Sequence, residues 1–390
     1  MVFRSYSSLL YHLLFQFTQH SKIDLDILEI KSLLSVELFD AALQIYQYGH
    51  NSLSSAPGDL IVQYRTLQSM ATSSDRANAT PYYDMFEFYN RDPDYAHSVI
   101  VDAFLGYGRF GEASMAQRAQ IIGDTLSYQV VYMYALAQCA DAVSDCKAGD
   151  LTANNENEVH SWDVCAAFLV GSLEGHTLGG SKHDNDGQLL YNLANVNSLQ
   201  MRRDNEEQYA KMNERIVDAF WSGKGALMQG ACSQAQRVVD ELFQFSLVPL
   251  MQGVVRYAKM VEGQEAPWSN TDSSLGAAEA ISRSILPVVC QYSEEDCKTL
   301  AENMLMRNGV KPVSNGTAAV VNALNSAIFV KSPYRAISCQ DVGGLDGVDA
   351  SCRSSTAYGL QGSSDGNILR SSWLGGLVPV VVALVVVAVV

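Results

Sequence analysis

The stretch Ala235–Val261, AQRVVDELFQFSLVPLMQGVVRYAKMV, decides the fold of this 390-residue chain. Its apolar residues recur at intervals of three and four, which is the spacing that lines one face of an α-helix. Other segments share this periodicity: Ile23–Leu34, Phe39–Tyr48, Ser114–Ala140, Val159–Leu173, Glu207–Phe220 and Leu275–Val289. Strand-like alternation is scarce, and Gly- and Asn-rich breaks separate the helical segments. The chain is therefore predicted to be an all-α helical bundle.

A weak internal repeat suggests how the bundle is organised. The phrase Ile100–Phe104, IVDAF, recurs as Ile216–Phe220. Downstream, Ala116-Gln117-Arg118 recurs as Ala235-Gln236-Arg237, and each copy leads into a long apolar helix. Two matches in the same order favour a duplicated helical unit. We therefore predict two related halves around a cleft, which is a natural place for a ligand.

Composition limits the classes of partner. The formal net charge is −16, and this acidity excludes nucleic acid and anionic lipid surfaces as main partners, since both need basic patches. A hydrophobic content of 48% argues against global disorder. The chain has 19 tyrosines. A tyrosine can be a packing residue, or its phenolate oxygen can bind a hard metal ion.

The eight cysteines favour disulfides over a structural zinc site, because no C-x-x-C pair occurs. Two pairs, Cys139/Cys146 and Cys290/Cys297, are spaced by seven residues. On one straight helix that step separates the sulfurs by ~10 Å, so a bridge within either pair requires a bend. Reduced, buried cysteines are the alternative.

The C-terminus carries the strongest local signal. Residues 374–390 contain only Leu, Gly, Val, Pro and Ala, and they follow a Gly/Ser-rich tether at 339–373. This layout fits a signal for a glycolipid anchor or a retained membrane span, and a buried core strand or helix is the remaining alternative. Residues 1–20 are predicted either to be a weak signal segment or to reflect a missing true start of the chain, and residues 21–338 are predicted to be the helical domain. The expected location is the extracellular face of the plasma membrane or a periplasmic space.

Two short motifs bear on processing and catalysis. The sequons at Asn78 and Asn315 are predicted glycosylation sites on a secretory route. Gly362–Gly366 matches the G-x-S-x-G nucleophile pattern, but it lies in the tether rather than at a strand-to-helix turn. We therefore predict that the protein is not an enzyme.

Three regions carry side chains that suit metal or anion binding. The Gly-rich loop that contains Glu174 and His176 is dense in carboxylate and imidazole groups, although a solvated polar loop is the alternative. Tyrosines gather around Tyr46 and again between Tyr82 and Tyr95. Arg65 lies between these segments and could hold an anion by paired hydrogen bonds, or pair with an acid.

Phrases spread over residues 23 to 335 carry a family resemblance. They are Phe39–Tyr46 with Gly49 and Asn51-Ser52, Arg65–Leu67, Tyr89–Ala96, Val170–Gly175, Asp186-Gly187 with Leu189–Ala194, and Met251–Gly253 with Arg256–Ala258. In this order they resemble the algal low-iron-inducible periplasmic (iron-assimilating) protein family. Diatom phytotransferrins, the iron-starvation-induced surface proteins, belong to the same group.

This resemblance implies high-affinity capture of ferric iron at the cell surface, with carbonate as a synergistic anion, followed by internalisation and release. It also implies endocytic or ferrireductase partners. The candidate metal ligands within or near the matching phrases are Tyr46, Tyr95, Glu174 and Tyr191, followed by Asp84 and His176. Arg65 is the candidate anion-binding residue. The rival hypotheses are a surface adhesion or structural protein without metal, and a secreted helical hydrolase.

Overall fold

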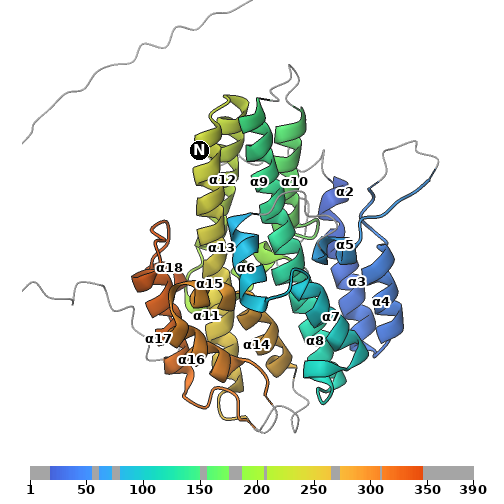
Figure 1. Ribbon diagram of the computed structural model, residues 1–390, viewed down its shortest axis with the longest axis vertical. Coiled ribbons are helices and arrows are strands. Elements are labelled where there is room, and N and C mark those ends of the chain that lie inside the picture. Colours follow the sequence, from blue (N-terminus) through green and yellow to red (C-terminus); the bar gives the residue numbers. More distant parts are fainter. Residues whose placement is uncertain are drawn as a thin grey trace, which may run out of the picture. The chain divides into compact units, whose positions relative to one another are not determined.

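Helix α13 (Cys232–Val261) lies at the centre of the fold and packs against α9, α11, α12, α14 and α17 (Figure 1). Its apolar stripe is buried from Ala235 to Val261, as the spacing predicts. The helix is long and apolar enough to cross a membrane by composition, but 83% of its most apolar window is buried inside the protein. Its apolar surface is therefore used to build the core.

The structure is a computed structural model that describes residues 18–54, 61–72, 80–149, 156–174, 187–205, 209–264, 273–307 and 310–345. All of these residues belong to one unit that extends to Cys352. Its first helices are α2 (Thr18–Ser21), α3 (Ile23–Ser35), α4 (Phe39–Tyr48), α5 (Leu67–Ala71), α6 (Pro81–Asn90), α7 (Tyr95–Leu105), α8 (Met115–Thr125), α9 (Tyr132–Ala148) and α10 (Glu156–Val170). The others are α11 (Leu190–Met201), α12 (Lys211–Met228), α14 (Ser274–Arg283), α15 (Leu286–Tyr292), α16 (Glu294–Met304), α17 (Thr317–Asn325) and α18 (Cys339–Val342).

The predicted all-α class is confirmed. Within the described ranges, β-type pairing is limited to two isolated bridges, Leu53 with Tyr64 and Asp204 with Ala210. A π-helical segment, η3 (Leu126–Val131), joins α8 to α9, so that one continuous helix runs from Met115 to Ala148. Such an insertion changes which side chains face the interior, and it occurs frequently at functional sites.

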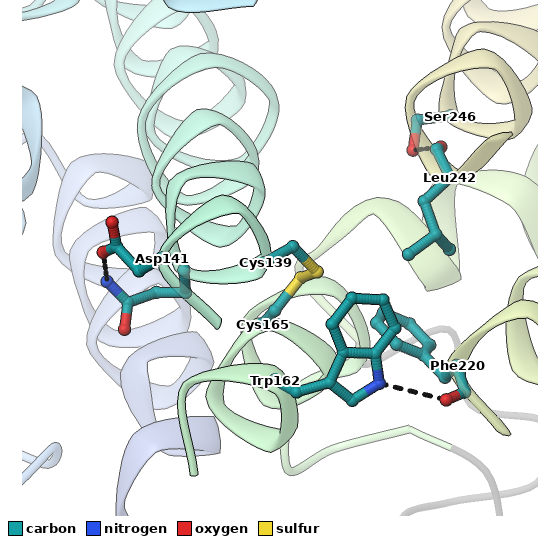
Figure 2. Close-up of a disulfide and its surroundings, with 8 residues drawn as sticks. Cys139, Asp141, Trp162, Cys165, Phe220, Leu242 and Ser246 are labelled. Atoms are coloured by element: carbon teal, nitrogen blue, oxygen red, sulfur yellow. Dashed lines mark hydrogen bonds between the residues drawn. A yellow bond between two sulfur atoms is a disulfide. The ribbon is translucent and has the colours of Figure 1, made fainter. Parts of the chain in front are cut away.

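Disulfides tie the long helices together. Cys139–Cys165 joins α9 to α10, and Figure 2 shows it beside Trp162, whose Nε1 donates to the carbonyl oxygen of Phe220 at 3.0 Å. Cys146–Cys232 joins α9 to α13. Both α9 cysteines bond to other helices because α9 continues unbroken between them. The preference for disulfides over reduced cysteines is confirmed for these residues.

The second pair of cysteines spaced by seven residues forms a bridge, Cys290–Cys297. The required bend is present, because Ser293 has extended backbone angles between α15 and α16. Its side chain also caps α16 by accepting a hydrogen bond from Asp296 N at 3.2 Å. The seven-residue spacing therefore permits this bridge because the helix breaks at Ser293, as the sequence predicts for a bridge of this kind.

The repeated phrases occupy similar places. Ile100–Phe104 lies on α7, which packs on α8, and Ile216–Phe220 lies on α12, which packs on α13. In both copies the Ile, Ala and Phe side chains are buried. The copies differ at the end, since α7 stops at Gly106 whereas α12 continues to Met228. A cleft between two related halves stays a prediction.

Some predicted features lie outside the described residues. These are residues 1–17, Asn78, His176, the tether from residue 346 onward and the apolar tail 374–390. The other sequon is described: Asn315 is exposed in the turn before α17, as a glycan acceptor has to be.

Candidate functional site

The predicted ligands that the structure describes fall into two groups. Tyr46, Tyr95 and Asp84 lie on α4, α7 and α6, while Glu174 and Tyr191 lie where α10 ends and α11 begins. In the first group, Asp84 is exposed and Tyr95 packs against the rings of Tyr83 and Phe86. The two groups therefore have to be considered separately.

Tyr46 is fully buried, and its ring stacks on that of His97. The Tyr46 hydroxyl and His97 Nδ1 form a hydrogen bond of 2.7 Å. Burial, and then the charge of Asp94, raises the pKa of Tyr46 well above its usual range. This phenol is thus held protonated and bonded within a packed aromatic layer.

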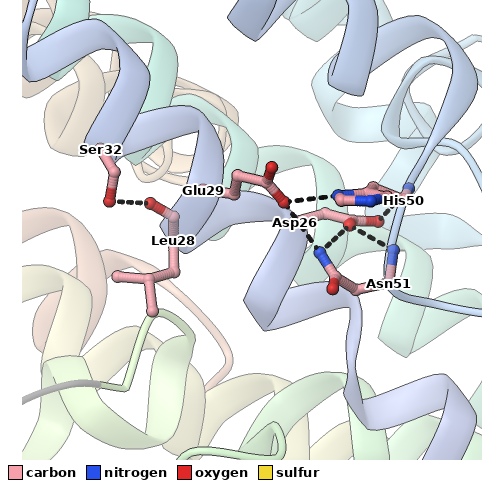
Figure 3. A network of polar contacts seen from close by, with 6 residues as sticks. All are labelled: Asp26, Leu28, Glu29, Ser32, His50 and Asn51. Carbon is pink, nitrogen blue, oxygen red and sulfur yellow. Dashed lines mark hydrogen bonds and ion pairs between the residues drawn. The ribbon is translucent and has the colours of Figure 1, made fainter.

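The loop after α4 is fixed by a polar network around Asp26 (Figure 3). The Asp26 carboxylate accepts hydrogen bonds from Asn51 N and Asn51 Nδ2, both at 2.7 Å, and His50 Nδ1 lies 2.8 Å from Glu29 Oε2. Burial raises the pKa of Asp26 despite these bonds, and the hydrogen bond to Glu29 raises the pKa of His50. The network anchors the Gly49–Ser52 phrase to α3.

Arg65 pairs with groups in the same region. Its Nη1 donates to the carbonyl oxygen of Leu53, and its Nη2 lies 3.2 Å from His20 Nε2. Burial lowers the pKa of Arg65. The guanidinium thus holds together the two ends of a loop, which accounts for much of its donor capacity. Its predicted anion role stays a prediction.

In the second group, a buried aspartate directs the chain toward Glu174. Asp24 on α3 accepts hydrogen bonds from Ser172 Oγ at 2.7 Å and Leu173 N at 2.9 Å. Gly171 has a φ of +88°, and a Cβ on it would lie 2.5 Å from Asp24 Oδ2. Burial raises the pKa of Asp24 to about 6. This clamp turns the chain inward immediately before Glu174.

The structure brings the predicted residues Glu174 and Tyr191 together. Glu174 is buried, and its carboxylate lies against Gly187, where an added Cβ would fall 1.4 Å from Oε1. Tyr191 lies four residues after Gly187, at the start of α11. Burial raises the pKa of Tyr191, and the negative charge of Glu174 raises it further. The buried Glu174 carboxylate thus acts electrostatically on the buried Tyr191 phenol.

Residues that the sequence did not single out extend this pair into a larger group. Asp124 on α8 is buried, with Lys31 Nζ at 3.6 Å and Gln120 Nε2 at 2.8 Å from its carboxylate. Burial and then the charge of Asp124 raise the pKa of Tyr128 on η3, and the charge of Glu174 raises it further. The same two causes raise the pKa of Tyr257 on α13 to about 12.

We name this group the central cluster: Asp124, Tyr128, Glu174, Tyr191, Arg256 and Tyr257. Arg256 supplies its positive charge, which acts on Asp124, Tyr128 and Tyr257. One guanidinium nitrogen, Nη1, donates to Asn197 Oδ1 at 3.3 Å, whereas the buried Nε has no hydrogen-bond partner within the described part of the chain. The guanidinium therefore retains a donor for a further acceptor.

The donor set decides what this cluster can bind. Among the described residues, no group of three or more His, Cys, Asp or Glu side chains is arranged to hold a metal ion. A cation at the central cluster would therefore need phenol oxygen in addition to carboxylate oxygen. Phenolate and carboxylate are oxygen donors that suit a hard cation, and a guanidinium suits a planar anion.

A sequence signal for the missing members existed in part. Arg256 and Tyr257 lie in a phrase that carries the family resemblance, and Asp124 and Tyr128 are four residues apart in a long predicted helix. Neither of these local spacings predicts that Asp124 and Arg256, which are more than 120 positions apart in the sequence, interact. The π-helical segment, which sets where Tyr128 points, has no periodicity of its own.

The interior of this helical, disulfide-bonded protein therefore holds phenols and carboxylates together with an arginine. Residues 13–198 match the model of a family described as low iron-inducible periplasmic protein. The family predicted from the ordered phrases is thus confirmed over this part of the chain, which includes Tyr46, Asp124, Glu174 and Tyr191. The family description names a periplasmic location and low iron, and it names no enzymatic activity.

Comparison with curated proteins gave no match. Comparison with solved structures gave none either.

Proposed function

We propose that this protein binds ferric iron outside the plasma membrane for high-affinity uptake, and that the central cluster is where it binds. The proposal is carried by the Arg256 guanidinium, which lies 5.3 Å from the centroid of the Tyr257 ring, and by the electrostatic effect of its charge on Asp124, Tyr128 and Tyr257. The match to a low iron-inducible periplasmic family supports iron as the cargo. The role is binding rather than catalysis.

The proposed chemistry is displacement of phenol protons by a hard trivalent ion. Tyr128 and Tyr257 are kept protonated by burial and by Asp124, so each releases a proton when its oxygen binds iron. Binding is therefore favoured as the pH rises and weakened as it falls. Acidification after internalisation would return the protons and release the ion.

Carbonate is the proposed synergistic anion, with Arg256 as its holder. A guanidinium offers parallel N–H donors to a planar oxyanion, and the buried Nε of Arg256 has no hydrogen-bond partner among the described residues. Lys31 adds positive charge next to Asp124. Arg65 remains the rival holder, and because it already pairs with Leu53 and His20 we assign it second place.

Among the sequence-predicted ligands, we retain Glu174 and Tyr191 as iron ligands. Tyr46 is assigned to packing, because its hydroxyl is bonded to His97 in a fully buried layer. We further propose that the apolar tail anchors the protein to the membrane and that a ferrireductase or an endocytic receptor acts on the loaded form.

The test is titration of the purified protein with ferric nitrilotriacetate, with and without bicarbonate, while the tyrosinate-to-iron absorption band is recorded. We expect tight, bicarbonate-dependent binding. Tyr257→Phe and Tyr128→Phe should each lose much of the band, and Arg256→Gln should lose the bicarbonate dependence. Tyr48→Phe is the matched control, because Tyr48 is 66% exposed.

Two results would overturn the proposal. Absence of tight ferric binding would favour an adhesion or structural role, in which substitutions in the cluster alter stability alone. Full binding by the Tyr128→Phe/Tyr257→Phe double variant would place the iron elsewhere. If Arg65→Gln, rather than Arg256→Gln, removes the bicarbonate dependence, the anion belongs to Arg65.

A further inference from the structure

A second group of phenols gathers around Phe243, nearer to the start of α13. Tyr82 on α6 stacks on the Phe243 ring with centroids 4.1 Å apart, and Tyr334 meets the same ring edge-on at 5.8 Å. Tyr292 on α15 meets Tyr334 edge-on at 5.4 Å. Segments that are far apart in the sequence therefore place three phenols around one point of the core helix.

The oxygen atoms of this group form two hydrogen-bonded pairs, Tyr292 with Tyr334 and Tyr82 with Asp240. Tyr292 Oη donates to Tyr334 Oη at 3.2 Å, and Tyr82 Oη donates to Asp240 Oδ1. After burial, the groups that raise the pKa of Tyr82 are Asp240, Tyr132 and Tyr292. Asp240 is exposed, so the group opens toward solvent on its side. We name it the α13 tyrosine cluster: Tyr82, Tyr132, Tyr292, Tyr334 and Asp240.

The Tyr132 hydroxyl provides a second, independent observation. Tyr132 is 1% exposed, and its hydroxyl has no hydrogen-bond partner within the described residues. The neighbouring Ser246 hydroxyl, which lowers the pKa of Tyr132 against the effect of burial, donates its hydrogen to the carbonyl oxygen of Leu242 at 2.7 Å (Figure 2). A buried hydroxyl is normally satisfied, so this oxygen is available to a ligand.

The α13 tyrosine cluster is separate from the central cluster. Asp240 and Arg256 lie sixteen residues apart on α13, which corresponds to about 24 Å along a helix that rises 1.5 Å per residue. The two clusters share no residue. An inference about the second cluster therefore does not depend on the function proposed for the first.

We propose that the α13 tyrosine cluster is a second site for a hard trivalent cation, bound by the oxygens of Tyr82, Tyr292, Tyr334 and Asp240, with the Tyr132 hydroxyl directed at the ion. Cation binding at this site releases protons and needs no oxidant or reductant. The Tyr82 proton passes to the Asp240 carboxylate and then to solvent as the phenolate binds the ion, and each further ligating phenol releases its own proton to solvent. The cation gains oxygen donors and no electron moves.

The test uses Tb³⁺ as the probe, because its emission is sensitised by a tyrosine close to the ion. The iron-free full chain is titrated with Tb³⁺ while tyrosine is excited, and stoichiometry is read by calorimetry. We expect two equivalents to bind. The Tyr292→Phe/Tyr334→Phe variant should bind one equivalent fewer, and the Tyr128→Phe/Tyr257→Phe variant should lose the other.

A milder variant controls for the case in which the double variant fails to fold. Tyr132→Phe removes a hydroxyl that holds no hydrogen bond, so the fold should persist while the affinity of one equivalent falls several-fold. Two unchanged equivalents in the Tyr292→Phe/Tyr334→Phe variant would overturn the proposal. So would a single equivalent in the unmodified protein that disappears in the Tyr128→Phe/Tyr257→Phe variant, and that result would leave the central site standing.

Discussion

Tyr46 and Tyr257 are both tyrosines within phrases that resemble the family, yet their surroundings differ. Tyr46 stacks on His97 and shares its hydroxyl with Nδ1 of that ring. Tyr257 is half-buried, the Arg256 guanidinium lies 5.3 Å from its ring centroid, and the charges of Asp124 and Arg256 shift its pKa in opposite directions. The first environment uses the phenol as a packing group with one satisfied bond. The second places a phenol among charged groups, where oxygen ligands and an anion holder are both at hand.

This difference shows why the position of a residue in a family phrase is a weak guide to its role. The phrases mark segments of the fold, and the charges that surround each phenol arrive from other segments. The aromatic layer of Tyr46, His97 and Phe104, which we name the α4 layer, joins only two helices, α4 and α7. The central cluster needs α8, η3, α11 and α13 together. The experiments below change one region while the other serves as the reference.

The largest effect is expected from Gly187→Ala, which adds a methyl group where the Glu174 carboxylate lies. The new Cβ would fall 1.4 Å from Glu174 Oε1, so this buried side chain has to move. We expect a loss of about 3 kcal/mol in the free energy of unfolding, measured by chemical denaturation, because overpacking and a displaced buried carboxylate act together. Ferric affinity should fall at least tenfold, the range of about 10–100-fold that supporting residues typically cost.

Gly225→Ala is the matched control for this experiment. Gly225 lies within α12, and a Cβ there would meet no atom within 4 Å. It should stabilise the protein by about 0.5–1 kcal/mol and leave iron binding unchanged, since alanine is the better helix former. If Gly187→Ala also left ferric affinity unchanged, Glu174 would have no part in the site.

A somewhat smaller effect is expected from Asp24→Asn, through the dependence of stability on pH. The pKa of Asp24 rises from 3.8 to about 6 on folding, so the folded state binds the proton more tightly. The stability from this group is fully present below about pH 3.8 and is lost as the pH rises toward 6. At 1.36 kcal/mol per unit, the loss amounts to about 2–3 kcal/mol.

Denaturation of both proteins between pH 3.5 and 7 checks this prediction (about the range over which Asp24 titrates). The unfolding free energy of the unmodified protein, minus that of Asp24→Asn, should fall with rising pH. Ferric affinity at neutral pH should fall in the variant, because Asp24 holds Ser172 and Leu173 directly before Glu174. A constant difference across the range would show that Asp24 titrates at an ordinary pKa.

Tyr46→Phe addresses the other side of the comparison and should have a smaller effect. It removes the partner of His97 Nδ1, and His97 is only partly buried, so water can replace the lost partner. We expect a loss of about 1 kcal/mol in the free energy of unfolding and no change in ferric affinity. Loss of the iron band in this variant would return Tyr46 to the list of ligands and would make the α4 layer the site.

Much of the architecture was predictable from the sequence because it depends on local pattern. The buried stripe of α13 and the bend that permits the Cys290–Cys297 bridge both follow from spacing along the chain. The pairing of Glu174 with Tyr191 was anticipated only through the family resemblance. Asp124 and Arg256 were missed, because their approach depends on tertiary packing and on a π-helical segment that local periodicity does not reveal.

The smallest effect on the free energy of unfolding is expected from the exposed pair of Glu29 and His50. Glu29 is a surface carboxylate, in contrast to the buried carboxylates of Asp24 and Glu174. The hydrogen bond to Glu29 raises the pKa of His50, so its contribution to stability is present below its unfolded pKa and is lost as the pH rises through the folded value. Because the two side chains are 38% and 59% exposed, His50→Gln should cost less than about 0.5 kcal/mol at pH 5. Ferric affinity should not change, since neither group touches the central cluster. A large loss of iron binding in this variant would mean that the network around Asp26, and not the interior, holds the ion.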